Sequence, residues 1–181
     1  MHSTRQALER FSLRALAALA CGFTACAPVL DWREVRTPGA AVVALMPCKP
    51  VAQQRQLNLA GARVVLSLQA CSAGGLTWGL VSADVADPAL LGAALDELLA
   101  ASARNVSARV TGGDAFAPPG STPNARSRRA RLAGTLPDGS RGQLESAVFT
   151  HGTWVFQATV LGEKADAEAA DNFFSSLRVV P

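Results

Sequence analysis

The sequence predicts an α+β domain in which two helices pack on a largely antiparallel β-sheet. Segments in which apolar and polar residues alternate recur within residues 41–82 and 128–160. Apolar residues at helical spacing occupy residues 88–104 and 164–176, between and after these segments. Period-two alternation indicates strands, and a period near 3.6 indicates helices. The order of strands, helix, strands, helix and short strand is typical of a single α+β domain, which we place at residues 40–181.

The first half of this domain is predicted to be an antiparallel meander. Residues 41–45 are an apolar run that ends before Pro47, and residues 53–59 alternate weakly. Residues 64–70 alternate strongly between apolar and polar side chains, and residues 76–82 continue the pattern after a Gly-Gly pair. Alternation on both sides of a glycine turn is the signal of a hairpin with one buried face.

A helix is predicted to follow the meander. Asp87 suits the N-cap position, and Pro88 suits the first helical position. Arg104 is favourable near the negative end of the helix dipole, and Asn105 can leave the helix in a left-handed conformation. The stripe that would face the sheet consists of Leu91, Ala94, Leu95, Leu98, Leu99 and Ser102.

The second half follows the longest loop, residues 111–125, in which Phe116 is the residue expected to bury. Long loops in compact domains are often functional or mobile. The elements predicted after it are strands at 128–136, 143–150 and 154–160, a helix with the stripe Ala170, Phe173, Phe174 and Leu177, and a short strand at 177–180.

Three short motifs carry a family resemblance. FFSSLR at residues 173–178 ends the last predicted helix, DWREV occupies residues 31–35, and PCKP occupies residues 47–50. The first motif, together with the element order, resembles the PsbP/Mog1-like sandwich. The three motifs are similar to those of small proteobacterial lipoproteins of unknown function. The resemblance implies a central sheet with helices packed on it, and it brings no activity with it.

The N-terminal segment predicts a lipoprotein signal peptide at residues 1–25. Three arginines precede an uncharged, Ala- and Leu-rich stretch that is too short to span a bilayer. Phe23-Thr24-Ala25-Cys26 then resembles a bacterial lipobox, in which the Cys26 thiol receives diacylglycerol as a thioether. Lipidation at Cys26 implies a membrane partner through the anchor and a position on the periplasmic side of a bacterial membrane.

Other interpretations of this segment stay open. Residues 18–20 form a cleavage site that would leave Cys21 first, residues 25–27 form another, and a buried apolar helix is a further alternative. Ala27, not Asp, follows the lipobox cysteine. By resemblance to enterobacterial lipoproteins, this favours the outer membrane over the inner one.

Residues 26–39 are predicted to be a lipidated N-terminus and tether. Pro28, Pro38 and Gly39 interrupt regular structure there. Trp32 would lie either at the level of the lipid headgroups, where indoles are favoured, or against the edge of the domain.

Cys48 and Cys71 are predicted to form a disulfide. An exported bacterial chain meets an oxidising periplasm, where two unlipidated cysteines are more often joined than free. The bridge would close a loop of roughly 24 residues and stabilise the fold by roughly 3 kcal/mol in the chain-entropy description. A redox or nucleophilic role is the alternative, but the sequence contains no C-x-x-C motif.

Arg126, Arg128, Arg129 and Arg131 concentrate positive charge at one predicted strand. Alternation places Arg129 and Arg131 on one face of that strand and Arg128 on the other. The cluster could bind phosphates of phospholipid or lipopolysaccharide, because guanidinium groups pair with phosphate in a bidentate manner. The alternative is an edge strand whose charges deter aggregation.

Composition and motifs narrow the function further. The 181 residues include 17 Lys and Arg and 14 Asp and Glu, and a net charge of +3 is too small to indicate a nucleic-acid partner. The sequence shows no recognisable metal, cofactor or hydrolase motif, so we predict none of these. His151, in a predicted turn, could act as a base only beside a nucleophile and an orienting acid.

We predict a non-catalytic binding or assembly module at the cell envelope, with an unidentified envelope protein as a partner. Headgroup binding by the arginines and an enzyme with an unrecognised site are the alternatives.

Overall fold

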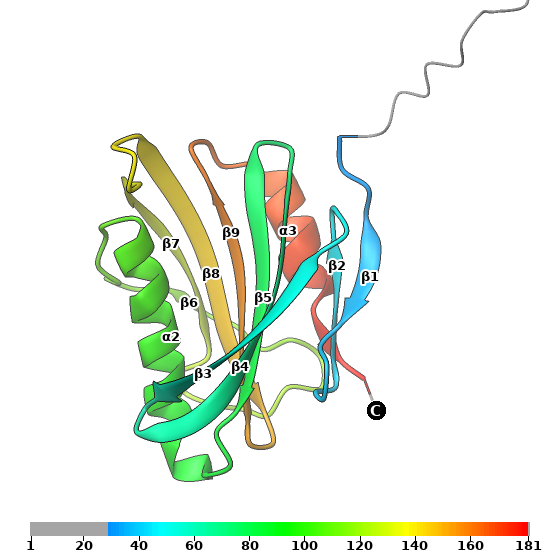
Figure 1. Cartoon of the computed structure of the whole chain (residues 1–181), viewed down its shortest axis with the longest axis vertical. Coiled ribbons are helices and arrows are strands. Elements are labelled where there is room, and N and C mark those ends of the chain that lie inside the picture. Colours follow the sequence, from blue (N-terminus) through cyan, green and yellow to red (C-terminus); the bar gives the residue numbers. More distant parts are fainter. Residues whose placement is uncertain (1–28, 181) are drawn as a thin grey trace, which may run out of the picture.

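The computed structural model describes residues 29–180 and shows an α+β domain (Figure 1). The predicted signal peptide, Cys21 and the Cys26 lipidation site lie outside these residues. A seven-stranded antiparallel sheet forms the centre, helix α2 covers one face, and helix α3 with a three-stranded sheet covers the other. The predicted fold class, a largely antiparallel sheet with two packing helices, is therefore confirmed. Between residues 29 and 180, no helix has the length and apolarity that a membrane span requires.

The large sheet has the order β3-β4-β5-β9-β8-β7-β6, and every neighbouring pair is antiparallel. The first three strands form the predicted meander, and β9 pairs with β5 to join the two halves of the chain. The strands are β3 (Val51–Leu59), β4 (Ala62–Ala73), β5 (Leu76–Asp84), β6 (Asp114–Ala115), β7 (Arg128–Thr135), β8 (Arg141–His151) and β9 (Trp154–Gly162).

Strand β4 differs from its predicted pattern in one respect. The sequence places Ser67 and Gln69 on a polar face, but both side chains are buried. The three-stranded sheet covers this face, and the Gln69 Nε2 group donates to the Arg36 carbonyl oxygen at 3.1 Å. Among residues 29–180 the Gln69 Oε1 atom has no hydrogen-bond partner, so this buried amide is satisfied on its Nε2 side only.

Helix α2 (Leu91–Asn105) follows the short 3-10 turn η1 (Pro88–Leu90). Asp87 caps this turn as predicted, because its carboxylate accepts from the Ala89 N–H at 2.9 Å. The predicted stripe is confirmed as the buried face of α2. The predicted left-handed exit at Asn105 is wrong, since positive φ occurs at Ser107 (51°). Val106 still donates to the Ala103 carbonyl oxygen at 3.2 Å, which delays the change of direction.

A buried amide explains why the α2 stripe includes a serine. Gln157 on β9 is 4% exposed, and its Nε2 atom lies 3.1 Å from the Leu98 carbonyl oxygen. The same atom lies 3.0 Å from Ser102 Oγ and 2.9 Å from Ser146 Oγ. Buried polar groups that find partners fix the position of one element on another, here α2 on β8 and β9.

The opposite face carries a small sheet with the order β1-β2-β10 and helix α3 (Ala167–Ser176). The strands are β1 (Arg33–Arg36), β2 (Val42–Met46) and β10 (Arg178–Val179). The predicted strand at 41–45 therefore exists, but it does not belong to the meander. Val42, Val43 and Ala44 are all fully buried, so β2 lies between two layers and pairs with β1 and β10 instead of β3.

The tether is shorter than predicted, because its second half is part of the fold. Residues 33–36 form β1, and Val35 is 7% exposed in the core. Trp32 packs edge to face on Trp78 with ring centroids 5.9 Å apart, which is the domain-edge alternative. An aromatic pair and a strand register therefore fix residues for which the proline and glycine content suggested irregular structure.

The predicted disulfide is present. Cys48 and Cys71 are bonded, with Cα atoms 6.0 Å apart. Cys48 follows β2, and Cys71 lies in β4, so the bridge joins the small sheet to the large one. The sequence predicts a link between two strands of one meander, whereas the structure shows a link between two layers.

Candidate functional site

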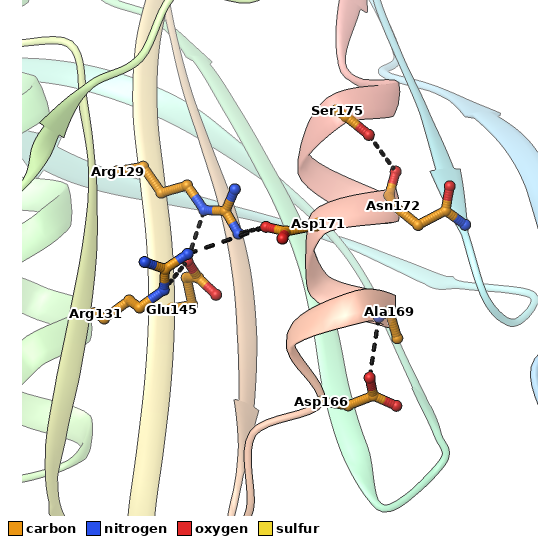
Figure 2. A network of polar contacts seen from close by, with 8 residues as sticks. All are labelled: Arg129, Arg131, Glu145, Asp166, Ala169, Asp171, Asn172 and Ser175. Carbon is orange, nitrogen blue, oxygen red and sulfur yellow. Dashed lines mark hydrogen bonds and ion pairs between the residues drawn. The ribbon is translucent and has the colours of Figure 1, made fainter.

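The four arginines of the predicted cluster are divided between two faces of the large sheet. Arg126 and Arg128 both pair with Asp96 of α2, at 3.0 Å and 2.7 Å. Arg129 and Arg131 point to the other face, where α3 packs (Figure 2). The alternation along the strand is as predicted, but a single basic patch does not form.

On the α3 face, Arg129 lies at the centre of a polar network (Figure 2). Its Nε donates to Glu145 Oε1 and its Nη2 to Asp171 Oδ1, both at 2.6 Å. Its guanidinium carbon also lies 4.2 Å from the centroid of the Phe174 ring. These contacts fasten α3 to β7 and β8, because Asp171 and Phe174 belong to the helix and Glu145 to the sheet.

The charge state of Arg129 follows from these partners. Partial burial by itself lowers the pKa of Arg129, because it disfavours the charged form. The hydrogen bonds and charge interactions with Glu145 and Asp171 outweigh burial, so the pKa lies above its ordinary value. Arg129 is therefore a permanent cation that holds the helix, and it has no charge free for a ligand.

Arg131 differs from Arg129 in exposure. Its Nε lies 2.8 Å from Glu145 Oε1, but its side chain is 68% exposed against 18% for Arg129. Its Nη2 lies only within 4.0 Å of the solvent-exposed Asp171 carboxylate. The terminal nitrogens of Arg131 therefore keep donors that a ligand can use.

Beside this network is a partly enclosed, mostly apolar pocket of about 200 Å³. It lies between the β7–β8–β9 face and the segment that enters α3. An engineered cavity of about 150 Å³ lined by apolar side chains is large enough for benzene, so this pocket has room for a short hydrocarbon segment. Its apolar lining includes Leu76, Val160, Ala167 and Ala170, and its polar lining consists of Arg131, Gln143, Glu145, Lys164 and Asp166.

The polar groups of the pocket have unequal availability. Glu145 is 12% exposed and already holds two arginines, and Asp166 caps α3 by accepting from the Ala169 N–H at 3.0 Å. Lys164 is exposed and has no ion-pair partner among residues 29–180. The donors left for a ligand are thus cationic, whereas the carboxylates have internal partners.

The sequence does not single out Glu145, Asp171 or Lys164. The strands predicted at 128–136 and 143–150 form a hairpin centred on Asp138, and this register pairs Arg131 with Glu145. The contact between Arg129 and Asp171 joins β7 to α3, and no local sequence pattern predicts a contact between elements so far apart in the chain.

His151 and the long loop are held by backbone contacts. The His151 Nδ1 atom lies 3.1 Å from the Gly120 carbonyl oxygen. Phe116 is half-buried, and its ring centroid lies 6.1 Å from that of Phe149 and 6.2 Å from that of Phe174. Thr122 N–H donates to the Thr150 carbonyl oxygen at 2.8 Å, so Thr122 and the Phe116 ring fasten this largely exposed loop to the domain.

Among residues 29–180, no three His, Cys, Asp or Glu side chains lie close enough to hold a metal ion. The pocket beside α3 is therefore the candidate site that the geometry favours. Neither the family models nor the curated proteins include a match to this chain.

Proposed function

We propose that this protein is a lipid-anchored binding module of the bacterial cell envelope that holds an amphipathic anion in the pocket beside α3. The observation that carries the proposal is the pairing of apolar pocket walls with the available donors of Arg131 and Lys164. Hydrocarbon is favoured in the apolar part, and a carboxylate or phosphate is favoured beside two cations. We further propose that the domain belongs to the PsbP/Mog1-like sandwiches, a proposal supported by helices on both faces of a central sheet.

The position of the N-terminal residues supports membrane attachment near this pocket. Leu30 lies against the turn between β4 and β5, where a Cβ on Gly74 would be 3.0 Å from Leu30 Cδ2. Leu30 and Trp32 also line a groove with Asp166, which itself lines the pocket. Figure 1 shows that the segment leading into β1, the β4–β5 turn and the loop before α3 lie toward the same end of the domain. A lipid on Cys26 would therefore hold the pocket close to the bilayer surface.

The anchor is tested by growing cells that express the full chain with labelled palmitate. We expect label on the wild-type protein and on Cys21→Ala, and we expect no label on Cys26→Ala. The reason is that the thioether requires the thiol of Cys26. Label that persists in Cys26→Ala, or its absence from the wild type, would disprove the anchor.

The pocket is tested with a diazirine-bearing fatty acid and the full chain reconstituted in vesicles. We expect cross-links on pocket-lining peptides. Ala167→Phe should reduce their yield severalfold, because Ala167 is an exposed residue at the pocket and a ring there fills the space. Arg131→Gln should weaken labelling by about five- to tenfold through loss of a charged hydrogen bond.

Arg126→Gln is the matched control for Arg131→Gln. Arg126 is 60% exposed and pairs with Asp96 on the other face of the sheet. Equal labelling of the two variants would show that Arg131 does not contribute to binding of the anionic group. Cross-links spread evenly over the surface in all variants would refute the pocket as the site.

A further inference from the structure

Strand β3 is a free edge of the seven-stranded sheet (Figure 1). It spans nine residues, and its first six, Val51 to Gln56, are all exposed. The opposite edge, β6, has only two residues. Natural sheets protect such edges with proline, several charges, bulges or short strands. β3 contains no proline and one charge, Arg55, and its pairing with β4 is continuous from Val51 to Leu59, without a bulge.

The hairpin turn determines which peptide groups face outward. Ala60 and Gly61 have φ of 51° and 89°, which fits a two-residue type I′ turn. Leu59 and Ala62 flank such a turn as a hydrogen-bonded pair, and every second residue of β3 then bonds to β4. The peptide groups of Ala52, Gln54 and Gln56 therefore point to the free edge. Six donors and acceptors in a row form a template for another strand.

Surface next to this edge is hollowed and partly apolar. A groove of about 350 Å³ lies over the start of β3 and the adjoining part of β4, and its lining includes Pro38, Ala52, Gln54 and Ser67. Val51 is 66% exposed, and Val65, on the neighbouring strand, is 48% exposed. An added strand would cover apolar surface as well as peptide groups.

We propose that a second copy of this chain binds here, by antiparallel pairing of β3 with β3 of the partner about a two-fold axis at Gln54. In this register Gln54 faces Gln54 of the partner subunit, and Ala52 faces Gln56 on either side. The outward peptide groups of all three residues then meet as hydrogen-bonded pairs. The two seven-stranded sheets become one continuous sheet.

Side-chain complementarity favours a second copy in this register. Val51 of one subunit lies opposite Leu57 of the other, which is an apolar pair. Arg55 lies opposite Gln53, so the only charge on the edge never faces a like charge. Apolar pairs stabilise cross-strand contacts and like charges destabilise them. A register centred on Arg55 would oppose two arginines, so the edge itself discriminates between the two alignments.

The register is tested by cysteine cross-linking of the full chain in the membranes of expressing cells. In Gln54→Cys, the two Cα atoms would be about 5.5 Å apart, within the range of about 4.4–6.8 Å that disulfides accept. Asn58→Cys is the matched control, since residue 58 is exposed and shares the face and the outward peptide orientation. In the proposed register its two copies would be roughly 27 Å apart.

We expect mild oxidation to give a dimer of twice the mass for Gln54→Cys and severalfold less dimer for Asn58→Cys. Equal dimer from both variants, or none from either, would overturn the proposal. A cross-link from Cys at position 54 to a different protein would overturn the second copy as the occupant.

A charge exchange gives an independent readout that requires no cysteine. Gln54→Lys and Gln54→Glu each place like charges across the two-fold axis and should weaken dimerisation by about two- to fivefold. Co-expression of the two variants should restore the dimer, as a Lys–Glu heterodimer. We expect both variants to keep the fold, because residue 54 is exposed and its side chain makes a single hydrogen bond, to Ser67 Oγ at 3.0 Å. Failure of the mixture to recover would contradict the two-fold axis at Gln54.

Discussion

Trp78→Ala should lower the free energy of unfolding by about 3–5 kcal/mol, the usual cost of truncating a buried tryptophan. Trp78 lies on β5 and is fully buried. Its ring contacts Trp32 and Phe173 edge to face, with centroids 5.9 Å and 5.5 Å away. The indole N–H donates to the Ala73 carbonyl oxygen at 3.2 Å. Urea unfolding of wild type and variant, followed by circular dichroism, measures the difference.

The size of this effect follows from the position of Trp78 between layers. The residue before β1, strand β5 and helix α3 each contribute an aromatic ring to this contact. Removal of the middle ring leaves a cavity that none of the three elements can fill alone. Thr77→Ala is the control, because Thr77 is exposed on the same strand and should change stability by no more than about 0.5 kcal/mol. A loss below about 1 kcal/mol for Trp78→Ala would contradict the packing described.

Removal of the disulfide by the double substitution Cys48→Ala and Cys71→Ala should lower the free energy of unfolding by roughly 3 kcal/mol. The bridge spans a sequence separation of 23 and restricts the unfolded chain accordingly. It also holds the small sheet, which contributes Met46 and Val42 to the main core. Urea unfolding of the double variant is compared with that of the wild type before and after reduction.

Reduced wild type should unfold at nearly the same urea concentration as the double variant, since both lack the same constraint. Each single variant should match the double one, because either change breaks the bridge. If full reduction of the wild type, verified by mass spectrometry, left the unfolding midpoint unchanged, the bridge would have no role in stability.

Local sequence signals predict most of the large sheet and both helices. The alternation at 64–70, the capping Asp87 with its apolar stripe, and the aromatic pair Phe173-Phe174 each lie within one element. Their burial follows from the period of that element alone. The cysteine pair is also accessible from the sequence, because only Cys48 and Cys71 remain once Cys21 of the predicted signal peptide and the predicted lipidation site Cys26 are set apart.

Contacts between distant elements explain what sequence reasoning missed. β1 is four residues long, too short for a period to show. β10 lies within the short strand predicted at 177–180, but its pairing with β2, like that of β1, joins segments far apart in the sequence. The carboxylates that divide the arginine cluster belong to α2, β8 and α3. The pocket depends on where α3 packs on the sheet. The apolar stripe of α3 predicts which face of the helix is buried, but it does not predict the position of the helix on the sheet.

The arrangement of the small sheet predicts an order in which its strands pair during folding. β2 obtains its two neighbours from β1 and β10, and the ion pair that spans it joins Glu34 and Arg178, which are 144 positions apart. Pairing across so long a separation is slow, because the chain must lose the conformational entropy of closing the loop before the contact can stabilise it. Cys48 and Cys71 are much nearer in sequence and can join β2 to β4 before β10 arrives. We therefore expect the bridge to hold β2 in place early in folding and β10 to pair with it last.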